Sequence, residues 1–325
     1  MPVKITRPGR DTKLEIGTMF STRSARWAAL AVLATASQFT AQTAAHADDT
    51  ATAPGKKIVV LGDSFAANPP YQHWDDPNVC HRGADSWPNQ LGALTGVAGT
   101  DDFVDESCSG ATIDTGAGYN MIVQSKLAAA DGAFGPDTQL VAVQVGIAES
   151  WRDGTNPFLD YVHDAACYGT WGSTKNCMNN DQSWLTDTGT LDGAGYAGRI
   201  GKVVDYVRYY APNARIVLLG YPEEFAPGST NLCTQSDMLP GLTFPKRNDA
   251  IAHYLDRLDS AQRDAAQQLG VEFMDVRAIT AGHDGCSADP WVGDATPIGT
   301  IEELHPRDGG NKAVAQALAA RVAGN

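Results

Sequence analysis

Positive charge is scarce in this sequence. Its 325 residues include 24 lysines and arginines against 38 aspartates and glutamates, which gives a formal net charge of −14 at pH 7. A surface with so few basic side chains repels phosphate backbones and is not drawn to an anionic membrane surface. We therefore expect no nucleic-acid partner and no charge-driven binding to membranes.

Long apolar runs are also missing. A membrane-spanning helix needs about 20 apolar residues, and the strongest candidate, 27–34, is much shorter. Two arginines precede this run and the small-residue site 45–47 follows it, which is the layout of a secretory signal peptide. We therefore predict that 1–47 is a signal peptide, that there is no integral membrane span, and that the protein is secreted and extracellular. A start at Met19 would give the peptide more usual proportions than a start at Met1.

Closely spaced cysteine pairs, which metal sites commonly use, do not occur. We therefore expect no metal, and we expect no organic cofactor. An even number of cysteines in an exported chain predicts disulfide bonds, and six cysteines allow about fifteen pairings. The cysteines are Cys80, Cys108, Cys167, Cys177, Cys233 and Cys286.

Short apolar runs alternate with amphipathic ones from 56 to 325. The runs typical of buried strands are 57–61, 103–105, 140–145, 215–219 and 271–276. Those with a helical period are 121–130, 196–210, 248–269 and 310–322. This alternation is typical of a parallel sheet with helices on both faces. We predict a single α/β domain at 56–325, after a polar linker at 48–55.

One stretch departs from this alternation. Residues from about 150 to 195 are rich in Gly, Asn, Thr and Trp and show no periodic apolar face. We interpret them as a long insertion rather than a second domain. Trp151 and Trp171 are candidates to line an acyl or sugar cleft, with packing in the core or against a disulfide as an equal alternative.

A serine and a histidine at opposite ends of the domain have the setting of a catalytic pair. Two residues separate Ser64 from the run 57–61, and ligands gather at the carboxyl ends of parallel strands. A nucleophilic serine needs a base, and the base needs an orienting acceptor. Glu302 stands three residues before His305, so its carboxylate can meet Nδ1 and leave Nε2 for Ser64. Taken singly, each motif could also be an ordinary turn with no catalytic function.

Together these motifs resemble the SGNH, or GDSL, hydrolase superfamily over essentially the whole chain after the signal peptide. Gly62-Asp63-Ser64 is similar to the first block of that family, 106–112 to the second, and His305-Pro306 to the last. The resemblance implies a flavodoxin-like three-layer α/β/α sandwich with a central parallel sheet. It also implies that Ser64 is the nucleophile, that His305 is the general base, and that the Ser64 and Gly110 amides hold the oxyanion.

The surroundings of the cysteines narrow the resemblance. The segments 79–82 and 107–110 resemble the secreted actinobacterial lipase and esterase branch. That branch pairs its cysteines in sequence order, which implies three disulfides here: Cys80 with Cys108, Cys167 with Cys177, and Cys233 with Cys286.

The third block departs from the family pattern. The family has Gly-x-Asn-Asp, whereas this chain has Gly146-Ile147-Ala148-Glu149. The asparagine that would donate to the oxyanion is absent, and loss of one such donor typically costs about 10²–10³ in rate. Gly146 and Glu149 stay candidates for support of this block, and an insertion side chain such as Asn156 is a candidate substitute donor.

The last block shows a milder change and has one rival. Glu302 stands where the family usually has aspartate, and a longer carboxylate can still orient His305. His283, beside Asp284, is a rival base, but its glycine-rich loop close to Cys286 favours a structural role.

Other motif assignments fit less well. The α/β-hydrolase elbow G-x-S-x-G needs a glycine where Ala66 stands. No G-x-G-x-x-G follows the first strand, so a dinucleotide-binding fold is not supported.

We therefore expect a secreted serine esterase or lipase that cleaves carboxylic esters through an acyl-enzyme. By resemblance its substrates are small-molecule lipid or short-chain acyl esters, and we expect a monomer. One alternative is a glycan O-acetyl esterase. The other, motivated by Ala148, is a weakened relative that binds lipid or glycan without turnover.

Overall fold

The structure is a computed structural model, and its description covers seven stretches of the chain. They are 53–69, 80–116, 118–151, 189–235, 243–247, 249–293 and 304–324. The predicted signal peptide at 1–47 and most of the predicted insertion lie outside the described residues. So do five residues singled out above: Asn156, Cys167, Trp171, Cys177 and Glu302.

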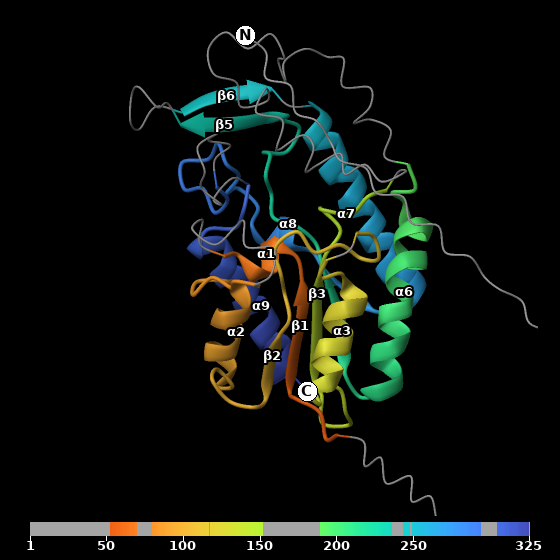
Figure 1. The fold of residues 1–325 in the computed structure, drawn as a ribbon. Coiled ribbons are helices and arrows are strands. Elements are labelled where there is room, and N and C mark those ends of the chain that lie inside the picture. The colour runs from red at the N-terminus through yellow and green to blue at the C-terminus, as the bar shows by residue number, and fades with distance from the viewer. Residues whose placement is uncertain are drawn as a thin grey trace, which may run out of the picture. The chain divides into compact units, whose positions relative to one another are not determined.

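Five strands form one parallel sheet in the order β2-β1-β3-β4-β7 (Figure 1). They are β1 (Ile58–Gly62), β2 (Phe103–Asp105), β3 (Leu140–Gln144), β4 (Arg215–Leu219) and β7 (Glu272–Met274). Strands β1 and β3 are buried along their whole length, as expected where both faces of a parallel sheet are covered. All five predicted strands are present, although the last ends before Val276 because the next helix begins there.

Helices cover both faces of the sheet. Alternate residues of β1 point to opposite sides, so Val59 and Leu61 join one core cluster and Ile58 and Val60 the other. The first cluster includes residues of α3 (Met121–Ala130), α6 (Gly193–Tyr210) and α7 (Asp249–Leu269). The second includes residues of α2 (Trp87–Thr95) and α9 (Asp308–Ala323). The arrangement confirms the three-layer α/β/α fold (Figure 1).

Most helices agree with the sequence patterns to within a few residues. Helix α6 begins at Gly193, capped by the side chain of Asp192, three residues before the predicted start at 196. Helix α2 was not predicted. Its first turn begins with Trp87 and Pro88, and Gly96 ends it. Two four-residue helices, α1 (Ser64–Ala67) and α8 (Val276–Ile279), also lie within the described stretches.

A hairpin outside the main sheet was also not predicted. Strands β5 (Asn231–Gln235) and β6 (Thr243–Arg247) pair in antiparallel fashion between β4 and α7. Pro245 within β6 argues against a strand in a sequence pattern, since proline cannot donate to a ladder. A two-stranded ribbon tolerates it because each strand has a free edge. The disulfide Cys233–Cys286 ties this hairpin to the loop after α8.

Two further features bear on function. None of the helices among the described residues is long and apolar enough to cross a membrane. A hollow of about 850 Å³ lies at the amino ends of the strands and is lined by Lys57, Gln139 and Arg215. Ligands of open parallel sheets bind at the opposite, carboxyl edge, so this hollow is not the candidate active site.

Candidate active site

The predicted nucleophile and base meet at the carboxyl edge of the sheet. Helix α1 begins with Ser64 directly after β1, and the Asp63 carboxylate caps it by accepting from the Phe65 N–H at 3.0 Å. The Ser64 Oγ lies 2.8 Å from the His305 Nε2. Both residues are buried. This distance suits proton transfer from a serine to an imidazole.

Backbone contacts hold the segment that carries His305. Val292 forms a β-bridge with Pro306, and the Gly293 N–H donates to the His305 carbonyl at 2.8 Å. The Asn68 side chain donates to the Pro306 carbonyl at 3.0 Å, which ties the segment to the end of α1. Leu304 has φ of 58°, a left-handed conformation that costs a residue with a Cβ roughly 1–2 kcal/mol. The described contacts around 305–306 offset that cost.

An aromatic ring supports the imidazole. Phe65 stacks on His305 with ring centroids 4.4 Å apart and an interplanar angle of 26°. The Phe65 ring also packs edge to face against the Tyr221 ring, with centroids 4.9 Å apart and an interplanar angle of 89°. Phe65 has no exposed surface. Its position next to Ser64 in α1 therefore couples the nucleophile turn to the base.

Gly110 reaches the same edge through an extension of the β1–β2 ladder. The Glu106 N–H donates to the Val60 carbonyl and the Cys108 N–H to the Gly62 carbonyl. A turn follows, closed by a hydrogen bond from the Ala111 N–H to the Cys108 carbonyl at 3.1 Å. Gly110 has φ of 72°, the positive value that the third residue of a type II turn requires. The turn's own hydrogen bond thus uses the N–H of the next residue and not that of Gly110.

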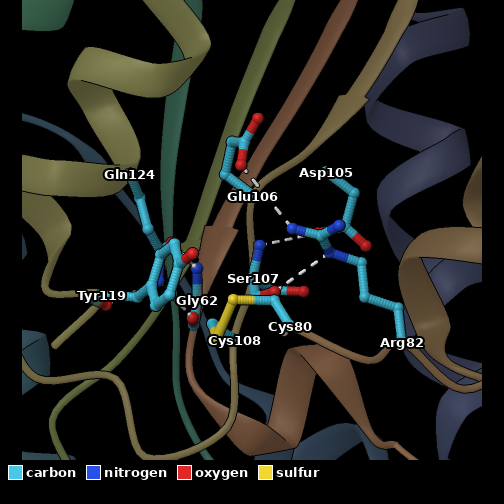
Figure 2. The surroundings of a disulfide bond; sticks show 9 residues. All are labelled: Gly62, Cys80, Arg82, Asp105, Glu106, Ser107, Cys108, Tyr119 and Gln124. Carbon is cyan, nitrogen blue, oxygen red and sulfur yellow. Dashed lines mark hydrogen bonds and ion pairs between the residues drawn. A yellow bond between two sulfur atoms is a disulfide. The ribbon is translucent and has the colours of Figure 1, made fainter. Parts of the chain in front are cut away.

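A disulfide and an arginine brace this segment (Figure 2). Cys80 and Cys108 are bonded, which confirms the first implied pairing. The Arg82 guanidinium lies beside Asp105 and Glu106, and its Nε donates to the Ser107 carbonyl at 3.0 Å. The disulfide and the Arg82 contacts therefore fix the chain over 105–108.

A glutamine side chain completes the ladder at the last residue of β1 (Figure 2). The Gly62 N–H donates to Gln124 Oε1 at 2.8 Å, and Gln124 Nε2 donates to the Gly62 carbonyl at 2.9 Å. The amide therefore supplies the acceptor for the Gly62 N–H and shares the Gly62 carbonyl with the Cys108 N–H, just before the Asp63–Ser64 turn. A Cβ at position 62 would lie 2.6 Å from the Ala66 Cβ, so this close approach requires glycine.

One tyrosine hydroxyl holds the degenerate third block: Tyr254 donates to the Ile147 carbonyl at 2.9 Å. Tyr196 donates at 2.6 Å to the carbonyl of Val145, the residue before the block. Gly146 has φ of 129°, and a Cβ there would lie 2.9 Å from the Tyr196 ring. Ala148 is buried and has only a methyl group to offer in place of an amide donor.

A third tyrosine links this block to the nucleophile turn. The Ile147 N–H donates to the Tyr221 hydroxyl at 2.9 Å, and that hydroxyl donates to Asp63 Oδ2 at 2.5 Å. Burial raises the pKa of Asp63 to about 7, although hydrogen bonds from Tyr221 and Phe65 act in the opposite direction. Burial and the neighbouring Asp63 also raise the pKa of Tyr221 well above its usual 10.

Glu149, the last residue of the third block, has no exposed surface. Its carboxylate accepts from the Ile113 N–H at 2.5 Å and the Ser150 N–H at 2.9 Å, and it contacts the Thr115 hydroxyl. Arg199 supplies the countercharge at 2.8 Å. Glu149 thus joins the loop after Gly110 to the rest of the third block.

Two other candidates lie apart from the Ser64–His305 pair. Trp151 is buried in the core, where its indole N–H donates to Tyr254 at 3.2 Å and its ring stacks on Tyr196, so core packing is the alternative that the structure shows. His283 stacks on Trp291, and its Nδ1 lies 2.7 Å from the Asp289 carbonyl. No group of three His, Cys, Asp or Glu that could hold a metal occurs in the part of the chain that the structure describes.

Sequence reasoning missed four residues around this site: Phe65, Gln124, Arg199 and Tyr221. One signal could have found Tyr221. Gly220-Tyr221-Pro222 follows β4 directly, and side chains at the carboxyl ends of parallel strands converge on one edge. The other three lie within helices, where the sequence shows no sign of their partners.

Known sequences resemble this chain over most of its length. The model of the GDSL-like Lipase/Acylhydrolase family matches residues 60–313. Lipase 1 of Streptomyces coelicolor is 27% identical over 280 residues, which cover 86% of this chain and 90% of that protein. The lipase of Streptomyces rimosus is 24% identical over 254 residues, which cover 78% and 81% of the two chains.

Solved structures share the fold. The extracellular lipase from Streptomyces rimosus superposes with a TM-score of 0.54 at 21% identity, covering 82% of this chain and 99% of that one. The phospholipase A1 from Streptomyces albidoflavus gives a TM-score of 0.54 at 20% identity, covering 81% and 99%.

Proposed function

The chain belongs to the GDSL-like Lipase/Acylhydrolase family and is an ester-cleaving hydrolase, and we propose that it acts on lipid or short-chain acyl esters through an acyl-enzyme on Ser64. The observation that carries the proposal is the 2.8 Å distance between Ser64 Oγ and His305 Nε2. A serine hydroxyl becomes a strong nucleophile when an adjacent base takes its proton.

In the first half-reaction, Ser64 Oγ attacks the ester carbonyl carbon while its proton passes to His305 Nε2. The tetrahedral intermediate then collapses, the bond to the alcohol oxygen breaks, and the alcohol leaves with that proton. In the second half, water attacks the acyl-enzyme and gives its proton to His305, which returns it to Ser64 as the carboxylic acid departs. We propose Glu302 as the acid that orients the imidazole.

The developing oxyanion needs preorganised donors. We propose the N–H groups of Ser64 and Gly110 for this role. Two features support them: Ser64 is the first residue of α1, where the N–H has no partner within the helix, and the turn at Gly110 is closed by the next N–H. The proposed hole lacks the side-chain donor that the family asparagine would supply.

We further propose that the protein is secreted and acts as a monomer. Two disulfides in the described residues support an oxidising compartment, and the arginines and apolar run within 1–47 support export. The S. rimosus relative is itself described as extracellular.

The test is hydrolysis of 4-nitrophenyl esters from acetate to palmitate by the purified oxidised protein. We expect Ser64→Ala and His305→Ala each to lose at least about 10⁴-fold in kcat. Ser125→Ala is the matched control, since its buried hydroxyl donates to the Met121 carbonyl of its own helix. Turnover by Ser64→Ala at the rate of the control would overturn the assignment.

The chain-length profile separates an esterase from a lipase. A second candidate function, binding without turnover, is favoured by the methyl group at Ala148 in place of a donor. It predicts no hydrolysis above the Ser64→Ala background for nitrophenyl esters or for acetylated glycans. Hydrolysis of acetylated glycans alone would instead favour an O-acetyl esterase.

A further inference from the structure

Three parts of the site meet at Tyr221, which follows β4. Its hydroxyl contacts Asp63 in the nucleophile turn and Ile147 in the third block. Its ring contacts Phe65, the ring on which His305 rests. Tyr221 is buried, so it cannot contact substrate from the surface.

The hydroxyl has a fixed direction. A tyrosine hydroxyl has one proton to donate and can accept from one donor. The Ile147 N–H can only donate, so the hydroxyl accepts a hydrogen bond from it at 2.9 Å. The hydroxyl in turn donates a hydrogen bond to Asp63 Oδ2 at 2.5 Å. Asp63 Oδ1 accepts in turn from the Phe65 N–H at 3.0 Å. A continuous chain of hydrogen bonds therefore runs from the third block into the first turn of α1.

That turn begins with Ser64, and its next residue carries the ring that stacks on the base. A shift of Asp63 relative to Ile147 would move Ser64 and Phe65 together. A shift of the Tyr221 ring would move Phe65 against His305. A misplacement of about 1 Å can cost about 10²-fold in rate.

We propose that Tyr221 is a positioning residue that fixes the Ser64–His305 geometry through Asp63 and Phe65. The inference rests on the proposed function of Ser64 and His305, and it assigns no contact between Tyr221 and substrate. In this family member, whose third block lacks the asparagine, the tyrosine ties that block to the nucleophile.

A matched control exists in the same core. Tyr196 is also buried, and its hydroxyl likewise donates once and accepts once. It donates to the Val145 carbonyl at 2.6 Å and accepts from Gln262 Nε2 at 3.3 Å. Tyr196→Phe therefore removes a hydroxyl of the same kind next to the third block, with no contact to Asp63.

The experiment compares Tyr221→Phe with Tyr196→Phe in the full oxidised protein. We expect Tyr221→Phe to lower kcat for a 4-nitrophenyl ester by about 10- to 100-fold with KM nearly unchanged. Tyr196→Phe should stay within about threefold of the unmodified protein, although both variants lose thermal stability. Equal activity in the two variants would show a merely structural role and overturn the proposal.

Two further measurements guard against misleading outcomes. If Tyr221→Phe does not fold, Asp63→Asn breaks the same chain of hydrogen bonds at the next atom, and kcat at the unmodified rate would overturn the inference. If Ser64→Ala keeps its turnover, the proposed function fails. The position of His305 is then tested by NMR of the protein without substrate. The imidazole ¹⁵N signals of His305 should change in Tyr221→Phe and not in Tyr196→Phe, and unchanged signals in both would refute it.

Discussion

The carboxylate of Glu149 and the guanidinium of Arg199 form an ion pair of 2.8 Å in which the glutamate has no exposed surface. Arg199 lies in α6, and its guanidinium also contacts the Ser150 carbonyl and lies over the Trp151 ring. The pair therefore joins α6 to the third block. Breaking a buried pair on one side leaves an uncompensated charge, which is more damaging than replacing both partners.

We expect Arg199→Met to lower the free energy of unfolding by about 3–5 kcal/mol. Adding Glu149→Gln should recover much of this loss because no buried charge then remains. Urea denaturation at pH 7 measures both. The control is Arg263→Met, which breaks two ion pairs of a half-exposed side chain and should cost about 0–1 kcal/mol. A loss in Arg199→Met no larger than in this control would contradict the prediction.

Asp63 makes stability depend on pH. Its pKa is raised from 3.8 to about 7 in the folded chain, so between those values the folded protein holds a proton that the unfolded chain has lost. Unfolding then releases a proton, and a rise in pH favours unfolding by up to about 1.4 kcal/mol per pH unit. The contribution is complete below pH 4 and is lost as the pH rises through about 7.

Asp63→Asn should remove this slope because the amide stays neutral. The measurement is urea unfolding of both proteins at pH 4.5, 5.5 and 6.5, with the difference between them as the result. Burial also raises the pKa of Glu224, so the variant alone will not be flat. Parallel curves for the two proteins would refute the assignment to Asp63.

The disulfide Cys80–Cys108 should affect both stability and activity. Replacing both cysteines by serine should lower the free energy of unfolding by about 2–4 kcal/mol. Since Cys108 precedes the Gly110 turn, we expect kcat to fall as well. The control replaces Cys233 and Cys286, which should lower stability and leave kcat of the folded protein unchanged. An equal effect on kcat in both variants would contradict the prediction.

The third block offers a gain of function. Ala148→Asn restores an amide side chain at the position where the family has its third oxyanion donor. One such donor is worth about 10²–10³ in kcat where it has evolved in place, and we expect a gain of about 10- to 100-fold. The larger side chain at this buried position should lower the free energy of unfolding by about 1–3 kcal/mol. An unchanged kcat in folded Ala148→Asn would mean that another group already donates.

Local patterns predicted the sheet well because its strands lie in short, mostly apolar runs. Alternation of those runs with helical ones also fixed the layers, and the Ser64–His305 pair followed from their places at strand ends and near the last helix. Helix α2 was missed since its apolar residues are few and interrupted by polar ones. The β5–β6 hairpin was missed because Pro245 argues against a strand.

Side chains that act through long-range contacts escaped prediction. Gln124 completes a ladder at Gly62 from a helix 62 residues away, and Tyr221 reaches Asp63 across 158 residues. Neither contact leaves a local period or spacing in the sequence. The pairing of Cys80 with Cys108, and that of Cys233 with Cys286, came from family resemblance and is confirmed.

The Ser64–His305 hydrogen bond spans 241 residues, and this has a consequence for timing. A chain is synthesised from its amino end, so Ser64 exists long before its base does. His305 directly precedes α9, which packs with α2 in one core cluster (Figure 1). The pair can therefore form only after residue 305 has been synthesised and its segment has docked at the end of α1. Until then the chain carries a serine without its base and is not activated for ester cleavage.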